Sequence, residues 1–128
     1  MYYREKDISI LIGETLVSVV GAEENSEIVI FTTKSGKKYE LYHIQSCCES
    51  VWLADVVGKV ENIIGSPLLK AEEVSSDDMG PMSEWTESYT WTFYRFLTAK
   101  GDLVLRWYGE SNGYYSEGVN FIEVGDND

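Results

Sequence analysis

One local cluster in the sequence holds residue types that bind metals. It runs His43-x-x-x-Cys47-Cys48-Glu49, and thiolate and imidazole donors gathered by a turn are the ligands of a tetrahedral zinc site. Structural zinc sites usually space two cysteines two to four residues apart, whereas these two are adjacent. We therefore expect no cofactor. One alternative is that this cluster holds zinc. The structural interpretation is that the cluster consists of two small buried thiols beside a packed histidine and binds nothing.

The same cluster offers a cysteine nucleophile beside a histidine base. However, no basic residue close by in the sequence would lower the pKa of Cys47 or Cys48. Elsewhere the chain shows no phosphate-binding glycine loop, no nucleophile elbow and no metalloprotease helix. We expect a protein that is not an enzyme, and a small metal-dependent enzyme built on the His43 cluster is retained as an alternative.

Two arginines, Arg95 and Arg106, lie in the most aromatic part of the chain. Because buried charges must be compensated, and the chain has 22 acidic residues against 10 basic ones, pairing with Glu or Asp is the structural interpretation. The alternative is an anion site on one sheet face beside Tyr94 or Tyr108, which would use the planar guanidinium fork. Arg95, Arg106 and Tyr108 are therefore candidate ligand-binding residues.

The segment GESNGYYS, residues 109–116, mixes turn residues with two tyrosines. Aromatic rings beside amide and hydroxyl groups are typical of recognition loops. Asn112, Tyr114 and Tyr115 are thus also candidate ligand-binding residues. The alternative is a hairpin whose tyrosines merely cover the edge of a sheet.

These candidates depend on residues 89–124, which we expect to form three consecutive antiparallel strands. Aromatic and β-branched residues alternate with others over residues 89–98, as in a half-buried strand. A three-residue loop, Ala99-Lys100-Gly101, would place glycine in the left-handed position and Leu97 opposite Leu103. A two-residue turn at Lys100-Gly101 would instead oppose Arg95 to Arg106, which sheets disfavour.

The next turn, Ser111-Asn112-Gly113, has the same form. It would align Leu105 with Val119 and Leu103 with Phe121, so that one apolar face crosses three strands. A two-residue turn at Asn112-Gly113 is the competing interpretation, and it would flip the last strand to the opposite face.

Earlier in the chain, alternation predicts strands over residues 15–20, 27–33 and 37–44. A turn at Lys34-Ser35-Gly36 would set Phe31 opposite Tyr39 and Val29 opposite Leu41. Residues 50–57 are ambiguous between strand and helix, whereas 67–76 favour a strand. Apolar spacing followed by glycine predicts short helices at two places, residues 4–12 and 60–64.

Composition bounds the remaining properties. The chain has 128 residues and a net charge of −12, so we expect a single domain, residues 1–128, that binds neither nucleic acid directly nor anionic membranes. Residues 1–12 would form a short helix or arm, 77–88 a mobile acidic loop and 125–128 a frayed tail. Adjacent cysteines rarely bridge each other, so we expect free thiols and a cytoplasmic protein.

Three longer stretches, HIQSCCESV, IIGSPLLKAEE and WTFYRFLTAKGDLVLRWYGESNGYYSEGV, resemble a family of small acidic proteins encoded by bacteriophages and prophages. The family is a domain of unknown function, and the resemblance extends from about Gly13 to Val124. It implies a phage or prophage origin and the cytoplasm of a bacterial host. It carries over no catalytic residues. Its motif positions in this chain are His43, Cys47, Cys48, Glu49 and residues 109–116.

The sequence therefore predicts an α+β domain, mostly an antiparallel meander of hairpins that is strongly curled or barrel-like, with one or two short helices. For function we expect an accessory protein that binds a host or phage component through an aromatic sheet or loop surface. An acidic nucleic-acid mimic that inhibits a host DNA-binding protein is an alternative. Because apolar side chains occupy both faces of the predicted sheet, self-association as a homodimer is an alternative to closing a barrel. The side chains on its second face are Ile28, Tyr42, Tyr94, Phe96 and Tyr108.

Overall fold

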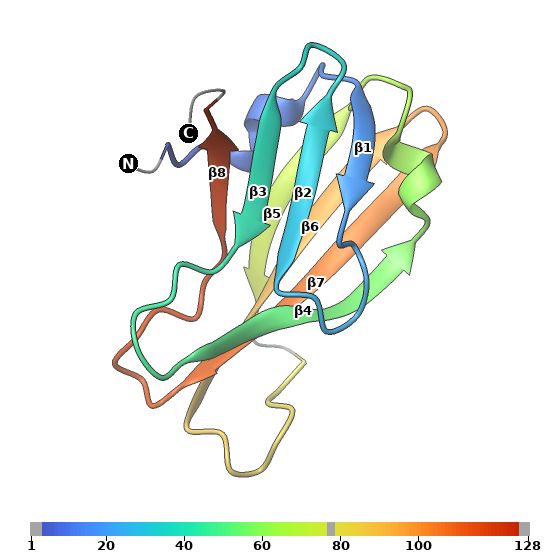
Figure 1. The fold of residues 1–128 in the computed structure, drawn as a ribbon. Coiled ribbons are helices and arrows are strands. Elements are labelled where there is room, and N and C mark those ends of the chain that lie inside the picture. Colours follow the sequence, from blue (N-terminus) through green and yellow to red (C-terminus); the bar gives the residue numbers. More distant parts are fainter. Residues whose placement is uncertain (1–3, 77–78, 126–128) are drawn as a thin grey trace.

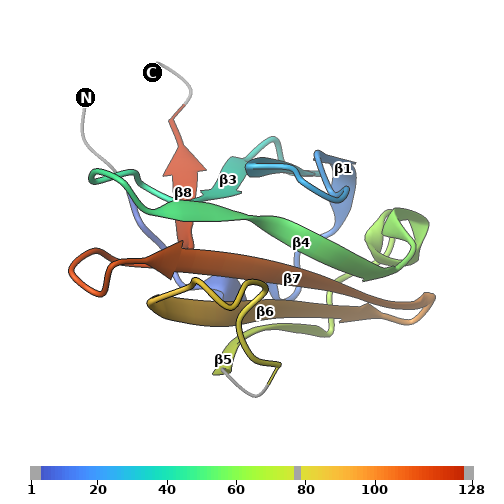
Figure 2. The ribbon, with the colours of Figure 1, turned by 90° about the horizontal axis from the view of Figure 1, so that it is seen from below.

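Two four-stranded antiparallel sheets lie face to face in this protein (Figure 1; Figure 2). The computed structural model describes residues 4–76 and 79–125. The first sheet has the order β1-β2-β3-β8, with β1 at Leu16–Val20, β2 at Ile28–Thr33, β3 at Lys38–Tyr42 and β8 at Asn120–Val124. The second has the order β4-β7-β6-β5, with β4 at Ser50–Gly58, β5 at Lys70–Ser76, β6 at Ser88–Thr98 and β7 at Gly101–Ser111. The antiparallel prediction is confirmed, but the strands form a two-layer sandwich and not a closed barrel.

The expected short helices are single 3-10 turns, η1 at Ile8–Leu11 and η2 at Val60–Ile63. Neither residues 4–76 nor residues 79–125 contain an α-helix, so the α+β assignment is wrong and this is a β-fold. At η1, Asp7 accepts a hydrogen bond from the Ser9 amide, and the chain is already extended again at Ile12. Ile8 and Leu11 are buried while Ile12 is exposed, because the helical period stops after one turn. Before η1, residues 4–6 form an arm that hydrogen-bonds along β8.

The hairpin of β2 and β3 has the predicted register. Phe31 lies opposite Tyr39 and Val29 opposite Leu41, and all four side chains are buried. The turn between the strands contains Gly36 at a φ of 96°, which glycine adopts without a Cβ penalty. Residues 50–57, ambiguous in the sequence, belong to strand β4.

The hairpin of β6 and β7 differs by one residue from the predicted register. Thr98 pairs with Gly101, so the loop contains two residues, and Leu97 lies opposite Asp102 instead of Leu103. A one-residue slip exchanges the two faces of a strand. The even residues Tyr94 and Phe96 therefore point into the core, while Arg95 and Leu97 are exposed.

The position of strand β8 shows that the hairpin predicted at the second turn is wrong. It pairs with β3 in the first sheet, with Phe121 opposite Leu41, so the expected pairs with Leu103 and Leu105 on β7 do not form. Residues 112–119 instead cross from one sheet to the other. The Phe121 ring stacks on Tyr39 at a centroid distance of 5.0 Å and adds an aromatic side chain to the inner face of the first sheet.

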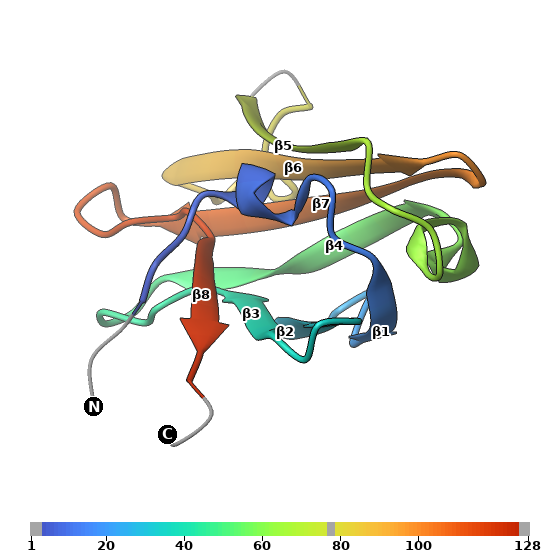
Figure 3. The same ribbon diagram turned by 90° about the horizontal axis from the view of Figure 1, so that it is seen from above.

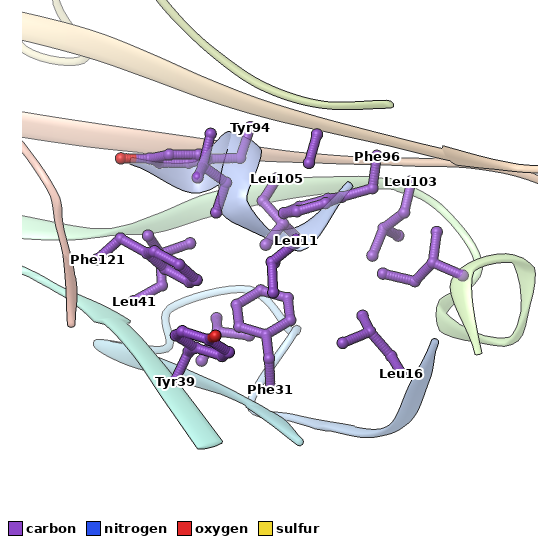
Figure 4. Packing of buried hydrophobic residues seen from close by; sticks show 14 of the residues in the cluster. Leu11, Leu16, Phe31, Tyr39, Leu41, Tyr94, Phe96, Leu103, Leu105 and Phe121 are labelled. Atoms are coloured by element: carbon purple, nitrogen blue, oxygen red, sulfur yellow. The ribbon is translucent and has the colours of Figure 1, made fainter. Parts of the chain in front are cut away.

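The space between the sheets is filled by a single hydrophobic cluster with members from both sheets. Figure 4 shows Leu11 of η1 between them, with Phe31 and Tyr39 on one side and Phe96 and Leu105 on the other. Seen from above in Figure 3, η1 lies near β5, with which it is in contact. The sandwich thus covers Tyr94 and Phe96, whereas Ile28 and Tyr42 lie on the outer face of the first sheet, where Ile28 is exposed, so self-association stays a prediction.

Tyr94 is the polar member of this core. Its hydroxyl donates to Oε1 of Glu73 at 2.5 Å. Burial, together with this carboxylate, raises the pKa of the Tyr94 hydroxyl, which therefore stays neutral and keeps donating. No helix within residues 4–76 and 79–125 has the length and apolarity to cross a membrane.

Candidate functional site

Three loops gather at the end of the sandwich that is lowest in Figure 1. They comprise residues 43–49, 79–87 and 112–119, and they follow β3, precede β6 and follow β7. A concave site of about 270 Å³ lies among them, and we call it the end cleft. It is lined by Cys48, Ser50, Ser83, Trp85, Thr86, Glu87, Glu110, Ser111, Asn112 and Tyr115.

The 79–87 loop is joined to the outer face of the second sheet at three points. The indole Nε1 of Trp91 donates to the Gly80 carbonyl at 2.8 Å, and the Met82 amide donates to the Tyr108 hydroxyl at 3.1 Å. Thr86 donates to Oε2 of Glu110 at 2.9 Å. The loop predicted to be mobile therefore has defined anchors on β6 and β7, while its first two residues, 77 and 78, lie outside the described part of the chain.

Tyr108, a candidate ligand-binding residue, is fully buried beneath this loop. Its ring packs edge-on against Trp91 and Trp52, at centroid distances of 4.9 and 5.2 Å. Its hydroxyl donates to Oε2 of Glu110 at 3.0 Å. Tyr108 thus supports the end cleft by fixing Glu110 and is not itself a contact surface.

Arg95 and Arg106 lie elsewhere on the same outer face. Arg106 is 3.2 Å from Oδ2 of Asp55 and lies over the Phe93 ring, 5.5 Å from its centroid. Arg95 is exposed and 3.8 Å from Oε1 of Glu72. Both arginines have acidic neighbours, as the structural interpretation predicts, and neither lines the end cleft.

The 112–119 loop places the other candidates. Asn112 and Tyr115 line the end cleft, whereas Tyr114 is 87% exposed at the tip. The loop is held from beneath by Glu117, a buried carboxylate that accepts hydrogen bonds from Ser111 at 2.5 Å and Thr90 at 2.8 Å. The tip is thus an exposed aromatic residue on a supported loop.

The 43–49 loop brings together the predicted metal-binding residues in a different arrangement. The Sγ atoms of Cys47 and Cys48 are 2.15 Å apart and form a disulfide, which corrects the expectation of free thiols. Nε2 of His43 lies 2.6 Å from Oε2 of Glu49, and Nδ1 donates to the Gly118 carbonyl at 2.7 Å. Within the described ranges 4–76 and 79–125, no group of three or more His, Cys, Asp or Glu is placed to hold a metal ion. His43 of this cluster therefore links the 43–49 loop to the 112–119 loop through its hydrogen bond to Gly118.

Glu49 carries a perturbed pKa. Burial alone would raise the pKa of this carboxyl, but the hydrogen bond with His43 and those donated by the Ser46 and Cys47 amides lower it from 4.5 to about 2. Because the folded pKa lies below the unfolded one, the ionised form stabilises the fold above pH 4.5. That stabilisation is lost as the pH falls toward 2.

We therefore expect wild-type protein to lose stability between pH 4.5 and pH 2 more steeply than the Glu49→Gln variant, which lacks this titration. Urea unfolding monitored by tryptophan fluorescence at several pH values measures both slopes. Glu24→Gln, which changes an exposed carboxylate, should keep the wild-type slope. Equal slopes for wild type and Glu49→Gln would contradict the assignment.

Sequence reasoning missed two residues that give the end cleft its character, Trp85 and Glu87, and it did not single out Glu110 within the 109–116 segment. Trp85 is 84% exposed, although tryptophan is usually well buried. A lone tryptophan in an acidic, turn-rich stretch was a usable signal. Nothing in the local sequence pattern indicated that this stretch would lie beside Glu110, which is 25 residues further along the chain than Trp85.

These features define an antiparallel two-sheet β-sandwich with a loop-lined, acidic and aromatic cleft at one end. The chain belongs to the family described as a domain of unknown function, DUF7448, which matches residues 9–121. This confirms the coarser part of the resemblance, membership in a domain family of unknown function that covers nearly the whole chain. No curated protein and no solved structure matches the chain.

Proposed function

We propose that the protein is a non-enzymatic accessory protein of a phage or prophage, which acts in the bacterial cytoplasm by binding a host or phage protein through the end cleft and its two flanking loops. The cytoplasmic setting rests on the family resemblance alone, because the free thiols that also favoured it are joined in a disulfide. The observation that carries this proposal is the exposure of two large aromatic side chains, Trp85 and Tyr114, at 84% and 87%. Tryptophan and tyrosine are enriched among the residues that contribute most to protein interfaces.

Anchoring of the flanking loops supports the same function. Trp85 lies between two anchors of its loop, the Met82 and Thr86 hydrogen bonds to Tyr108 and Glu110. Tyr114 follows a turn in which Asn112 accepts a hydrogen bond from the Tyr114 amide at 3.1 Å. Loops that are ordered before binding lose less conformational entropy when the partner docks.

The phage or prophage assignment rests on the resemblance of the HIQSCCESV and GESNGYYS segments. Both segments contribute to the end cleft, through Cys48 and Ser50 on one side and through Glu110, Ser111, Asn112 and Tyr115 on the other. The parts of the chain that carry the resemblance thus meet at the surface to which we assign binding. The nucleic-acid mimic draws support from the net charge of −12 alone and gives no role to the exposed aromatic residues.

Co-purification from host lysate tests the proposal. Wild-type protein should retain a specific protein that the Trp85→Ala/Tyr114→Ala double variant loses, with affinity reduced by about 1,000-fold, since two interface hot spots of about 2 kcal/mol each contribute about 4 kcal/mol together. Val20→Ala, which truncates an exposed residue on β1, is the matched control and should bind like wild type. A retained protein that is equally bound by both variants would contradict the assigned surface.

A further inference from the structure

Resting on the proposed function, we infer that the end cleft binds a basic side chain, arginine or lysine, that projects from the partner protein. The site would hold the cationic group between the carboxylates of Glu87 and Glu110 and beside the indole of Trp85, all three of which line the cleft.

The charge of the cleft selects a cation. Glu87 and Glu110 are acidic, and the described residues that line the cleft include no lysine, arginine or histidine. The whole chain adds a net charge of −12, so its long-range field attracts positive partners and repels anions.

Glu110 is already oriented. Its Oε2 accepts hydrogen bonds from both Tyr108 and Thr86, which fixes the carboxylate, and an ionised carboxylate has about four acceptor positions in all, so that it can accept further hydrogen bonds from a ligand. A guanidinium or ammonium group donates such charge-assisted hydrogen bonds. The face of an exposed indole adds an attractive cation–π contact, and Trp85 is exposed beside the cleft.

The size of the cleft limits the ligand. Pockets for drug-sized molecules and cofactors occupy roughly 300–1,000 Å³, and the end cleft measures about 270 Å³. It therefore has room for a single side chain of the partner protein. The rest of the partner would contact the rim, where Tyr114 is exposed.

Nuclear magnetic resonance titration with N-acetylarginine amide tests this inference on the full chain. We expect the probe to shift the Trp85 indole resonance, and the isosteric but neutral N-acetylcitrulline amide not to shift it. Glu87→Gln should weaken binding by about threefold to tenfold, as should a rise in salt from 20 to about 300 mM. Glu84→Gln removes the same charge from the same loop outside the cleft lining and should leave the affinity near that of wild type.

Equal shifts of the Trp85 indole resonance with the arginine and citrulline probes would overturn the inference. Shifts with methyl glucoside alone would also overturn it and would indicate a sugar-binding site instead. Absence of any shift with arginine or lysine amides at 50 mM would overturn it too. If co-purification still depends on Trp85 and Tyr114 in that case, the binding function stands and only the cationic ligand fails. If co-purification does not depend on them, the proposed function fails.

Discussion

Replacing Phe31 with alanine is expected to lower the free energy of unfolding by about 3–5 kcal/mol, the range for truncating a buried aromatic residue. Phe31 is buried on β2 and touches rings from both sheets. Its centroid lies 5.5 Å from that of Phe96 and 6.1 Å from that of Phe121. The truncation thus opens a cavity at the contact between the two layers.

Urea unfolding gives this value, and Phe93→Ala provides the matched control. Phe93 is a partly exposed residue on the outer face of β6, beneath the Arg106 guanidinium. Its truncation removes less buried surface and should cost clearly less. Equal losses for the two variants would mean that the inner and outer faces of the sandwich are assigned wrongly.

The second large effect is expected at Gly109 on β7. A Cβ at this position would lie 2.3 Å from the carbonyl oxygen of Glu117, and a backbone atom cannot move aside as a side-chain tip can. Gly109→Ala should therefore displace the 112–119 loop and cost about 2–3 kcal/mol, the upper range for overpacking. Loss of the loop position should also move Asn112 and Tyr115 out of the end cleft.

Gly118→Ala is the control for this second prediction, because its Cβ would meet only Ser116 Oγ at an ordinary 3.6 Å. Thermal unfolding of both variants measures the difference, and amide resonances of residues 112–117 report the loop position. Gly109→Ala protein with wild-type stability and unchanged loop resonances would refute the close approach.

Local patterns predicted what depends on neighbours in sequence. The alternation of apolar residues located the strands other than β4, whose residues 50–57 also fitted a helix, and Gly36 identified a turn whose register is observed. The same reasoning gave the wrong pairing register for β6 and β7. A three-residue loop was preferred because a two-residue turn at Lys100-Gly101 would place Arg95 opposite Arg106. The observed register avoids that pair as well, by placing Arg95 opposite Val104.

The register of β6 on β7 depends on packing against the first sheet. Tyr94 and Phe96 fill the space facing Phe31 and Tyr39, so the correct face of β6 is known only once the first sheet is in place. Strand β8 presents the same difficulty. The turn residues around Gly113 fit a hairpin, but Phe121 instead completes the first sheet beside β3, a contact 80 residues distant in sequence.

The end cleft was predictable only in part. Asn112 and Tyr115 lie on it, as the composition of their loop indicates, and Tyr114 flanks it. The position of Trp85 and Glu87 at this cleft could not be predicted, because their loop is placed by hydrogen bonds to Tyr108 and Glu110 on a distant strand. The cysteine pair was interpreted from a general tendency of adjacent cysteines to stay unbridged, which the structure does not follow.

Site-specific photo-crosslinking tests the central claim most directly, that a partner protein docks at the end cleft. A Ser83→p-benzoylphenylalanine substitution places the reactive group in the lining of the end cleft and leaves Trp85 in place. The same group at Val20 on β1 provides the control in the other sheet. We expect position 83 to capture, in host lysate, the same protein that co-purifies with wild type, and position 20 to capture none. Capture of the same protein from position 20, or of nothing from position 83 while a retained partner is present, would contradict the account.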